Sequence, residues 1–523
     1  MASRVRRMPP IKVDEYRWRS PPNDTRLRVR RACATEAMFG IEASNHNGEN
    51  DFFIATTVRF HASSAGSKIL TLRDLERMTQ SSLVQLRVSQ PQVAVTLSWD
   101  KQGKCMLQYR TPKVVDEVHQ WAASIVTAEA NLHSPIDMRD QVEEKKNQES
   151  SISNNNAITV YISSPVTALD AGLENSEVHY LFRFNHCLFD GIAARQIVAM
   201  LFQSLVAEMS DSSFNKYEDV DWKQSTNNLP PAFVELMDSE QDLCGPRFDR
   251  TVHDHMALMK KKSTLGLNPL QSNPKRPQTE FYTFTEAESQ SMLSSIRTRL
   301  QPGHSITHLA MGAVLLALMK ADSARNATSF SSISVIDGRR YLKEDYKKGE
   351  KPYIASCQAP AIILFENVNE LAIGDISSKR ELRDKLVKAA GLAKNSFISN
   401  VATPCKLSMS VPVMEFGAVL AAMSQKPLAP PQIESPVFAS DGINERYIPR
   451  EFYAHSNEKA IHVDDVYFFS NQSLCTVSVR LSSWRDCVRL SIDYNEGCHD
   501  KKDMIAFVNE IAKIMLVLSN ETD

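Results

Sequence analysis

The stretch from residue 177 to residue 209 constrains the fold of this chain more than any other. Residues 178–184 read VHYLFRF, with apolar side chains at every second position, as in a buried β-strand. The motif NHCLFDG follows, and from about Ile192 apolar side chains recur at spacings of three and four, which is typical of a helix. The sequence therefore predicts a strand, a tight loop and a helix in direct succession.

The remaining segments mix the same two kinds of element. In the first half, strands are predicted at residues 52–60, 94–99, 107–110 and 157–163, a helix at 116–132 and an exposed polar loop at 143–156. In the second half, helices are predicted at residues 309–320, 381–394 and 502–518, strands at 331–336 and 359–365, and a hairpin from 476–481 and 488–494. This mixture indicates an α/β fold.

The length predicts more than one hydrophobic core. The chain has 523 residues, and single cores stop growing at about 250–300 residues. A polar, proline-punctuated stretch follows residue 210 and is typical of a connection between domains. We expect an N-terminal domain at 1–225, a crossover segment at 226–280 and a C-terminal domain at 281–523.

One pattern occurs twice. A strand, an Asn, an Asp five positions later and a helix follow one another at Asn185 and Asp190, and again at Asn495 and Asp500. The residue after the Asn is His186 in the first copy and Glu496 in the second. The pattern favours two halves of related fold, of which one carries a base.

Composition excludes several classes of function. With 60 basic and 62 acidic side chains, the net charge of -2 argues against a nucleic-acid partner. No run of 18 uncharged apolar residues is present, so no membrane span is expected. No two of the 17 glycines have the spacing of GxGxxG, GxxxxGK or GxSxG, which excludes those phosphate-binding and hydrolase motifs.

The nine cysteines indicate a reduced chain. No two of them lie within ten residues of each other, so CxxC zinc or redox motifs are excluded. No disulfide framework is evident, and the N-terminal region lacks the apolar core of a secretory signal. We expect a cytoplasmic protein without a bound metal.

His186 is the strongest candidate for chemistry. It follows an apolar strand and stands in a loop closed by Asp190 and Gly191. An imidazole held there can accept a proton near neutral pH. Two alternatives remain open from the residues alone: a buried histidine with a purely structural role, and an Asp190 that either caps the helix or pairs with an arginine.

NHCLFDG resembles the HxxxDG motif of the CoA-dependent acyltransferase superfamily, which includes chloramphenicol acetyltransferase, the plant BAHD enzymes and peptide-synthetase condensation domains. The segment ISVIDGRRYL resembles the family segment in which an arginine follows a strand of the second domain, and YNEGCHD resembles the last strand and helix. The resemblance implies two similar chloramphenicol acetyltransferase-like domains, each a mixed sheet with helices, and a solvent channel between them.

The resemblance also implies roles for four residues. His186 matches the general base, Asp190 the structural carboxylate, and Gly191 the small residue that lets the loop turn. Arg339 is the candidate partner of Asp190, with Arg340 as the alternative.

The chain departs from the superfamily at two places. Asn185 stands where condensation domains usually have a second histidine, which argues against peptide-bond formation. The plant DFGWG motif is absent, and its counterpart by position is Ser440-Asp441-Gly442-Ile443-Asn444. Ser440, Asp441 and Gly442 are therefore weak candidates for the CoA channel, and a plain turn is the alternative.

Over most of its length the chain resembles the fungal trichothecene acetyltransferases of this superfamily. This implies an O-acetyltransferase of mycotoxin biosynthesis that uses acetyl-CoA as co-substrate, holds no permanent cofactor and acts as a monomer on a trichothecene alcohol, at C-15. Another hydroxyl or amine acceptor, a longer acyl-CoA, or a binding module without catalysis are the alternatives.

Overall fold

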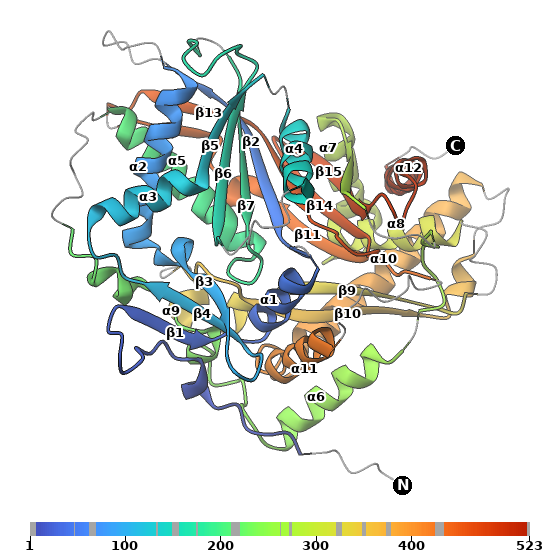
Figure 1. Cartoon of the computed structure of the whole chain (residues 1–523). Helices are drawn as coiled ribbons and strands as arrows, with labels where there is room; N and C mark the ends of the chain where they lie inside the picture. The colour runs from blue at the N-terminus through green and yellow to red at the C-terminus, as the bar shows by residue number, and fades with distance from the viewer. Residues whose placement is uncertain are drawn as a thin grey trace.

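The computed structural model describes residues 7–46, 48–61, 70–131, 134–148, 156–173, 176–210, 220–261, 263–270, 275–320, 327–347, 352–372, 378–423, 433–454 and 456–519. The fold is mixed α/β, with four sheets and helices on their faces (Figure 1).

The largest sheet has six strands in the order β12-β13-β2-β7-β6-β5. Their bounds are Glu451–Tyr453, Lys459–Ser470, Phe52–Phe60, Val178–Phe184, Ile158–Ser164 and Val126–Ala130. Helices α2 (Leu72–Ser89), α3 (Val115–Ile125) and α5 (Gly191–Ser210) cover one face, and α4 (Pro135–Gln148) packs on the other. The strand and helix predicted around NHCLFDG are therefore confirmed.

The alternation along β7 separates two cores. Val178, Tyr180, Phe182 and Phe184 lie in the core under α5, and Leu181 lies in a smaller cluster on the opposite face. By length and composition, α5 alone among the described helices could cross a membrane, but half of that window is buried inside the molecule. Helix α5 is a core helix of this sheet.

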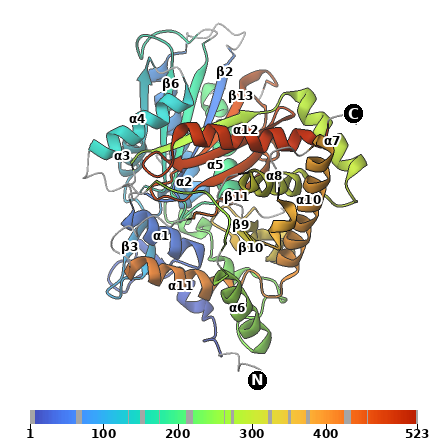
Figure 2. The same ribbon diagram turned by 90° about the vertical axis from the view of Figure 1, so that its right-hand side faces the viewer.

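A second sheet has the order β11-β14-β15-β8, with bounds Val437–Ile443, Ser478–Trp484, Cys487–Asn495 and Pro277–Thr283. Strands β14 and β15 form the predicted hairpin, turning at Arg485 and Asp486, which both have positive φ. Helix α12 (Lys501–Val517) lies across this sheet beside α7 (Glu286–Arg299), α8 (Ile306–Met319) and α10 (Lys379–Ala402), as Figure 2 shows.

Two small sheets complete the architecture. One pairs β9 (Ser329–Asp337) with β10 (Gln358–Glu366), and the other has the order β1-β4-β3, from Leu27–Arg31, Cys105–Arg110 and Thr96–Trp99. The remaining helices are α1 (Thr35–Asn45), α6 (Pro246–Met259), α9 (Glu344–Lys347) and α11 (Ser410–Met423). Short 3₁₀ helices span Val13–Tyr16, Pro91–Ala94, Gln224–Asn228, Phe233–Glu235, Gly338–Tyr341, Val368–Leu371 and Asn444–Arg446.

The sheets do not follow the order of the chain. Strands β12 and β13 come from the last third of the sequence, yet β13 pairs with β2 in the first sheet. Strand β8 begins at Pro277, inside the segment expected as a crossover, and pairs with β15. The domain division 1–225, 226–280 and 281–523 stays a prediction. Strand β13 of its C-terminal domain pairs with β2 of its N-terminal domain.

The predicted internal similarity extends to hydrogen bonds. Asn185 Oδ1 accepts the N–H of Cys187, and Asn495 Oδ1 accepts that of Gly497, both at 3.0 Å. Asp190 and Asp500 each accept the N–H two residues further on, at the start of α5 and α12. The two halves thus build the same loop between a strand and a helix.

Two segment predictions were wrong. Residues 143–148 belong to α4 instead of an exposed loop, and 149–155 lie outside the described residues. The helix predicted at 116–132 ends at Ile125, where Val126 starts β5. In both places contacts with other elements determine the secondary structure: α4 packs on β2 and β7, and β5 pairs with β6.

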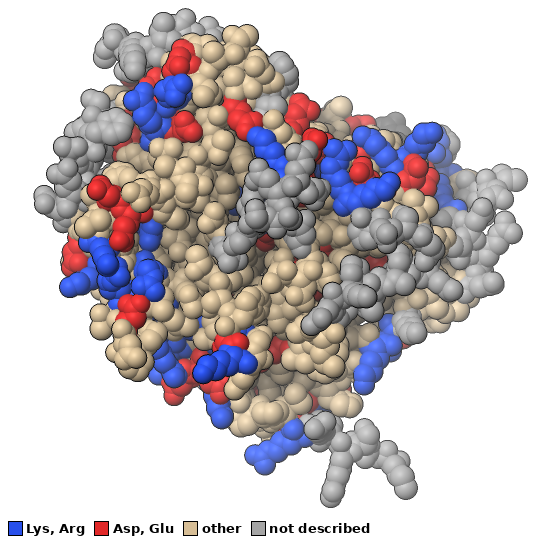
Figure 3. Space-filling view, in the orientation of Figure 1, with Lys and Arg blue, Asp and Glu red and all other residues tan. Residues whose placement is uncertain are grey.

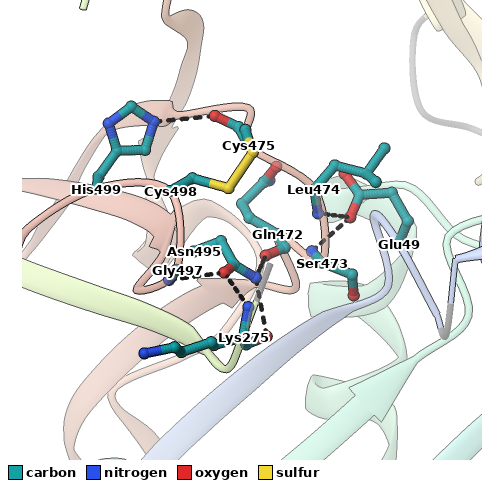
Figure 4. Close-up of a disulfide and its surroundings, with 10 residues drawn as sticks. All are labelled: Glu49, Lys275, Gln472, Ser473, Leu474, Cys475, Asn495, Gly497, Cys498 and His499. Carbon is teal, nitrogen blue, oxygen red and sulfur yellow. Dashed lines mark hydrogen bonds between the residues drawn. A yellow bond between two sulfur atoms is a disulfide. The ribbon is translucent and has the colours of Figure 1, made fainter. Parts of the chain in front are cut away.

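The expectation of a chain without disulfides is also wrong. Cys475 and Cys498 are bonded (Figure 4). The hairpin explains why: Ser478 pairs with Asp493, so the cysteines just beyond these strand ends meet although they are 23 residues apart. The other described cysteines, seven in number, are free.

Charges of both signs are interspersed on the face seen in Figure 3. Lys and Arg stand beside Asp and Glu around its rim, and the described residues at its centre are mostly uncharged. This distribution agrees with the net charge of -2.

Removal of the disulfide should cost stability. Cys475→Ser should lower the free energy of unfolding by about 3 kcal/mol, because the disulfide lowers the conformational entropy of the unfolded chain. Thermal unfolding with and without dithiothreitol measures this, and reductant should bring the unsubstituted protein to the melting temperature of the variant. Cys244→Ser, at an exposed free thiol, is the control. Equal melting temperatures for Cys475→Ser and the control would contradict the prediction.

Candidate active site

His186 stands directly after β7, where the sheet holds the loop. Its Nδ1 lies 2.9 Å from the carbonyl oxygen of Phe189. Because a carbonyl only accepts, Nδ1 carries the proton and donates it. Nε2 is therefore the nitrogen with a lone pair, on a half-buried ring.

Aromatic rings fix the imidazole. Phe39 of α1 stacks on it with ring centres 4.2 Å apart, and Phe52 of β2 meets it edge-on at 4.9 Å. Burial lowers the pKa of His186, the Phe189 carbonyl and Asp190 raise it, and Arg480 lowers it, for a net decrease. The environment thus favours the neutral ring, which is the form that accepts a proton.

Asp190 is fully engaged as an acceptor. Its Oδ1 accepts the N–H groups of Ile192 and Ala193, at 3.1 and 2.9 Å, and its Oδ2 accepts the N–H of Cys357 at 2.9 Å. Arg339 adds a bidentate ion pair, in which Nη1 donates to Oδ2 at 2.8 Å and Nη2 donates to Oδ1 at 3.0 Å. These five bonds make Asp190 both the helix cap and a brace.

Arg339 lies after β9, and its guanidinium is almost fully partnered. It also donates to the carbonyl oxygens of Tyr353 and Ala355. Burial would lower the pKa of Arg339, but the Asp190 carboxylate outweighs it and raises that pKa. Arg340, the alternative partner, is exposed. The Asp190–Arg339 pair therefore joins the HxxxDG loop to the second half of the chain.

Gly191, expected to let the loop turn, does not use the conformational freedom of glycine. It is the first residue of α5 and is absent from the described residues with positive φ, so the turn does not require glycine. A Cβ there would lie 3.2 Å from Arg195 Nη2 and 3.6 Å from Phe468 Cε2. The nearer neighbour is the end of a side chain of the same helix, and Phe468 of β13 lies at an ordinary van der Waals distance.

Asp441 is part of a bulged strand, so the plain-turn alternative is wrong. The register of β11 against β14 shifts between Ser440 and Gly442, and Gly442 has φ +73°. The Asp441 carboxylate pairs with Arg195 of α5 at 3.2 Å and with Arg480 of β14 at 2.8 Å. The bulge turns this carboxylate towards the HxxxDG loop.

A pocket of about 450 Å³ lies on the other side of β11. Two of the three channel candidates, Ser440 and Gly442, line it, and Ser440 shares a hydrogen bond of 2.8 Å with Thr307 at the start of α8. The rest of the lining combines apolar and polar side chains: Gln290, Leu293, Ile306, Ile443, Glu445, Arg450, Leu481, Ser482, Ser483, Asp486 and Val488. Strand β11 therefore separates this pocket from the HxxxDG loop.

Sequence reasoning missed Arg195 and Arg480. Arg195 lies within an apolar helix five residues after Asp190, and a charge at such a position needs a partner. Arg480 lies 3.7 Å above the Phe468 ring, which stacks on Phe52 and so leads to His186. Only the tertiary structure brings these residues together.

His133 and His499 also stand four residues before an Asp, as His186 does. His499 is buried and donates Nε2–H to the carbonyl oxygen of Cys475. His133 lies outside the described residues. Among the described residues, no cluster of three or more His, Cys, Asp or Glu could hold a metal ion.

Replacement of the brace should destabilise the fold. Asp190→Asn leaves the buried Arg339 with the half-buried Asp337, at 3.1 Å, as its remaining counter-charge, which should cost about 3 kcal/mol of unfolding free energy. Asp500→Asn, at the equivalent but exposed cap of α12, should cost less than about 1 kcal/mol because asparagine also caps helices. Urea denaturation of both variants measures the difference, and equal losses would contradict the role of the ion pair.

Comparison with known proteins agrees with this site. Residues 8–418 match the family described as 15-O-acetyltransferase Tri3. The trichothecene 15-O-acetyltransferase TRI3 of Fusarium sporotrichioides is 28% identical over 98% of this chain and 99% of its own length. The trichothecene O-acetyltransferase TRI3 of Trichoderma arundinaceum is 28% identical over 99% and 100%.

Solved structures give the same result. That of the Fusarium sporotrichioides enzyme superposes with a TM-score of 0.89 at 28% identity, over 98% of this chain and 99% of that one. The X-domain from teicoplanin biosynthesis, at a TM-score of 0.56 and 11% identity over 94% and 95%, shares the fold. With its two similar halves joined at the HxxxDG loop, the chain belongs to the 15-O-acetyltransferase Tri3 family, whose members are acyltransferases.

Proposed function

We propose that this protein transfers an acetyl group from acetyl-CoA to the C-15 hydroxyl of a trichothecene, with His186 as general base. The observation that carries the proposal is the hydrogen bond from His186 Nδ1 to the Phe189 carbonyl, because it leaves Nε2 able to accept a proton. The relatives named as trichothecene acetyltransferases support the acceptor.

The reaction needs no covalent enzyme intermediate. Nε2 of His186 removes the proton of the acceptor hydroxyl while that oxygen attacks the thioester carbonyl. The tetrahedral intermediate collapses, the C–S bond breaks, and the CoA thiolate receives the proton from the imidazolium. Asp190 carries no proton in this scheme, since its five hydrogen bonds require the carboxylate.

The pocket beside β11 suits the co-substrate. Its volume of about 450 Å³ lies within the usual range for small-molecule sites. Ile306 and Thr307 at the start of α8 line it, and a helix N-terminus favours anionic groups such as the phosphates of CoA. The acceptor would approach along the aromatic side of His186, where Phe39 and Phe52 offer apolar surface. The interdomain channel connecting these two sides stays a prediction.

Two further features belong to the proposal. We infer a monomer that works in the cytoplasm, where acetyl-CoA is available, and that keeps no permanent cofactor. Thiol release from acetyl-CoA, measured with and without a trichothecene alcohol, tests the function directly. Release that is independent of the alcohol, or that needs an amine or a longer acyl-CoA, would favour the alternatives.

Loss of the imidazole should abolish most turnover. His186→Ala should lower kcat at least about 100-fold, the usual contribution of a general base. Glu496→Ala, at the equivalent position of the second half, should retain kcat and is the matched control. Thiol release measures both, with circular dichroism to verify folding. A folded His186→Ala protein with full turnover would remove the base assignment.

The pH profile should report the lowered pKa of His186. Because the neutral ring is the active form and burial lowers its pKa, kcat/KM should fall on acidification only at a lower pH than the ordinary histidine pKa of about 6.5 would give. Phe39→Leu opens the stacked face to water and should move the acidic limb to higher pH. Initial rates between pH 5 and 9 measure both, and a limb above pH 6.5 in the unsubstituted protein would contradict the prediction.

A further inference from the structure

We propose that Asp51 is a positioning residue, which holds the backbone of His186 through a hydrogen bond and is itself fixed by a buried ion pair with Arg183. The proposal rests on the proposed function of His186. Asp51 comes directly before β2 and Arg183 lies in β7, on neighbouring strands of the same sheet.

The ion pair is among the most deeply buried in the molecule. The side chains of Asp51 and Arg183 are 1% and 2% exposed, and Asp51 Oδ2 accepts a hydrogen bond from Arg183 Nη2. The other guanidinium nitrogens, Nε and Nη1, have no hydrogen-bond partner among the described residues. Asp51 is therefore the carboxylate that forms an ion pair with Arg183 in the described part of the chain.

The second oxygen of Asp51 reaches the base. Oδ1 accepts the backbone N–H of His186 at 3.3 Å. The next three N–H groups of the loop, of residues 187–189, are all donated to Asn185, within the loop itself. Of the four N–H groups of residues 186–189, that of His186 is therefore the one donated to another segment of the chain.

Asp51 is held in turn by the second half of the chain. Its carbonyl oxygen accepts the N–H of Asn471 at 2.7 Å, and Asn50 donates its N–H to the carbonyl of Asn471 at 3.0 Å. Glu49 accepts the N–H groups of Ser473 and Leu474, next to the disulfide (Figure 4). The carboxylate that meets His186 is therefore fixed from both halves.

The position of the His186 backbone decides where Nε2 lies. The ring is fixed at one end by the bond to Phe189 and at the other by its own backbone. A displacement of 1 Å in a reacting group can cost about 100-fold in rate. Loss of the Asp51 bond should therefore lower kcat and leave the binding of acetyl-CoA largely unchanged.

Two double variants separate this role from plain stability. Asp51→Asn/Arg183→Gln removes both charges but keeps an oxygen that can accept from His186, and Asp51→Leu/Arg183→Met removes both charges and the acceptor. Neither leaves a buried charge unpaired. The Leu/Met pair should lose about 10- to 100-fold in kcat, with less than about threefold change in the KM for acetyl-CoA, and the Asn/Gln pair should recover most of the kcat.

A matched control uses another ion pair between strands. Asp465 and Arg489 pair at 2.9 Å without contacting the HxxxDG loop, so Asp465→Leu/Arg489→Met should keep kcat. Melting temperatures verify that all variants are folded. Should the Leu/Met pair at 51 and 183 not fold, Asp51→Ser/Arg183→Met gives the same test, because the hydroxyl is too short to reach His186.

The outcomes are distinct. Wild-type kcat in the folded Leu/Met pair, or equal losses in the Leu/Met and Asn/Gln pairs, would overturn the positioning role. Full turnover of His186→Ala would instead overturn the base assignment on which the proposal rests, whatever the Asp51 variants do.

Discussion

The buried ion pair between Asp190 and Arg339 is the contact on which the arrangement of the site depends. It joins the start of α5 to the end of β9, two elements that belong to different cores. Two opposite charges removed from water are costly unless each is well partnered. Asp190 meets this condition with three backbone N–H groups, and Arg339 with two carbonyls. The pair therefore fixes the relative position of the two halves four residues after the base.

Strands exchanged between the two halves add further contacts to this ion pair. Strand β13 places Phe468 against Phe52, and β14 places Arg480 over Phe468 and against Asp441. The imidazole of His186 thus lies at the end of a packed series of groups from both halves. Geometry near the base is therefore a property of the whole fold.

The sequence predicted the local elements well and the long-range contacts poorly. The β7–α5 unit and the β14–β15 hairpin follow from periodicity, which is a property of neighbouring residues. Arg339 was identified through resemblance, whereas Asp51 and Arg480 carry no local signal and meet their partners only in the folded chain. The charge of Arg195 within an apolar helix indicates that it has a partner but does not identify it. The disulfide is an intermediate case, because the register of the predicted hairpin already brings residues 475 and 498 together. The separation of 23 residues along the chain does not by itself indicate that the two cysteines meet.

The two equivalent loops share a backbone conformation but differ in the side chains around them. Both use an Asn to order the turn and an Asp to cap the helix. In the first, aromatic rings contact the side chain of the next residue, His186, and a buried carboxylate accepts its backbone N–H. In the second, Glu496 lies 3.6 Å from Arg276, and the disulfide at Cys498 anchors the loop. The side chains around each loop therefore determine whether its central residue can act as a base, and the loop only positions that residue.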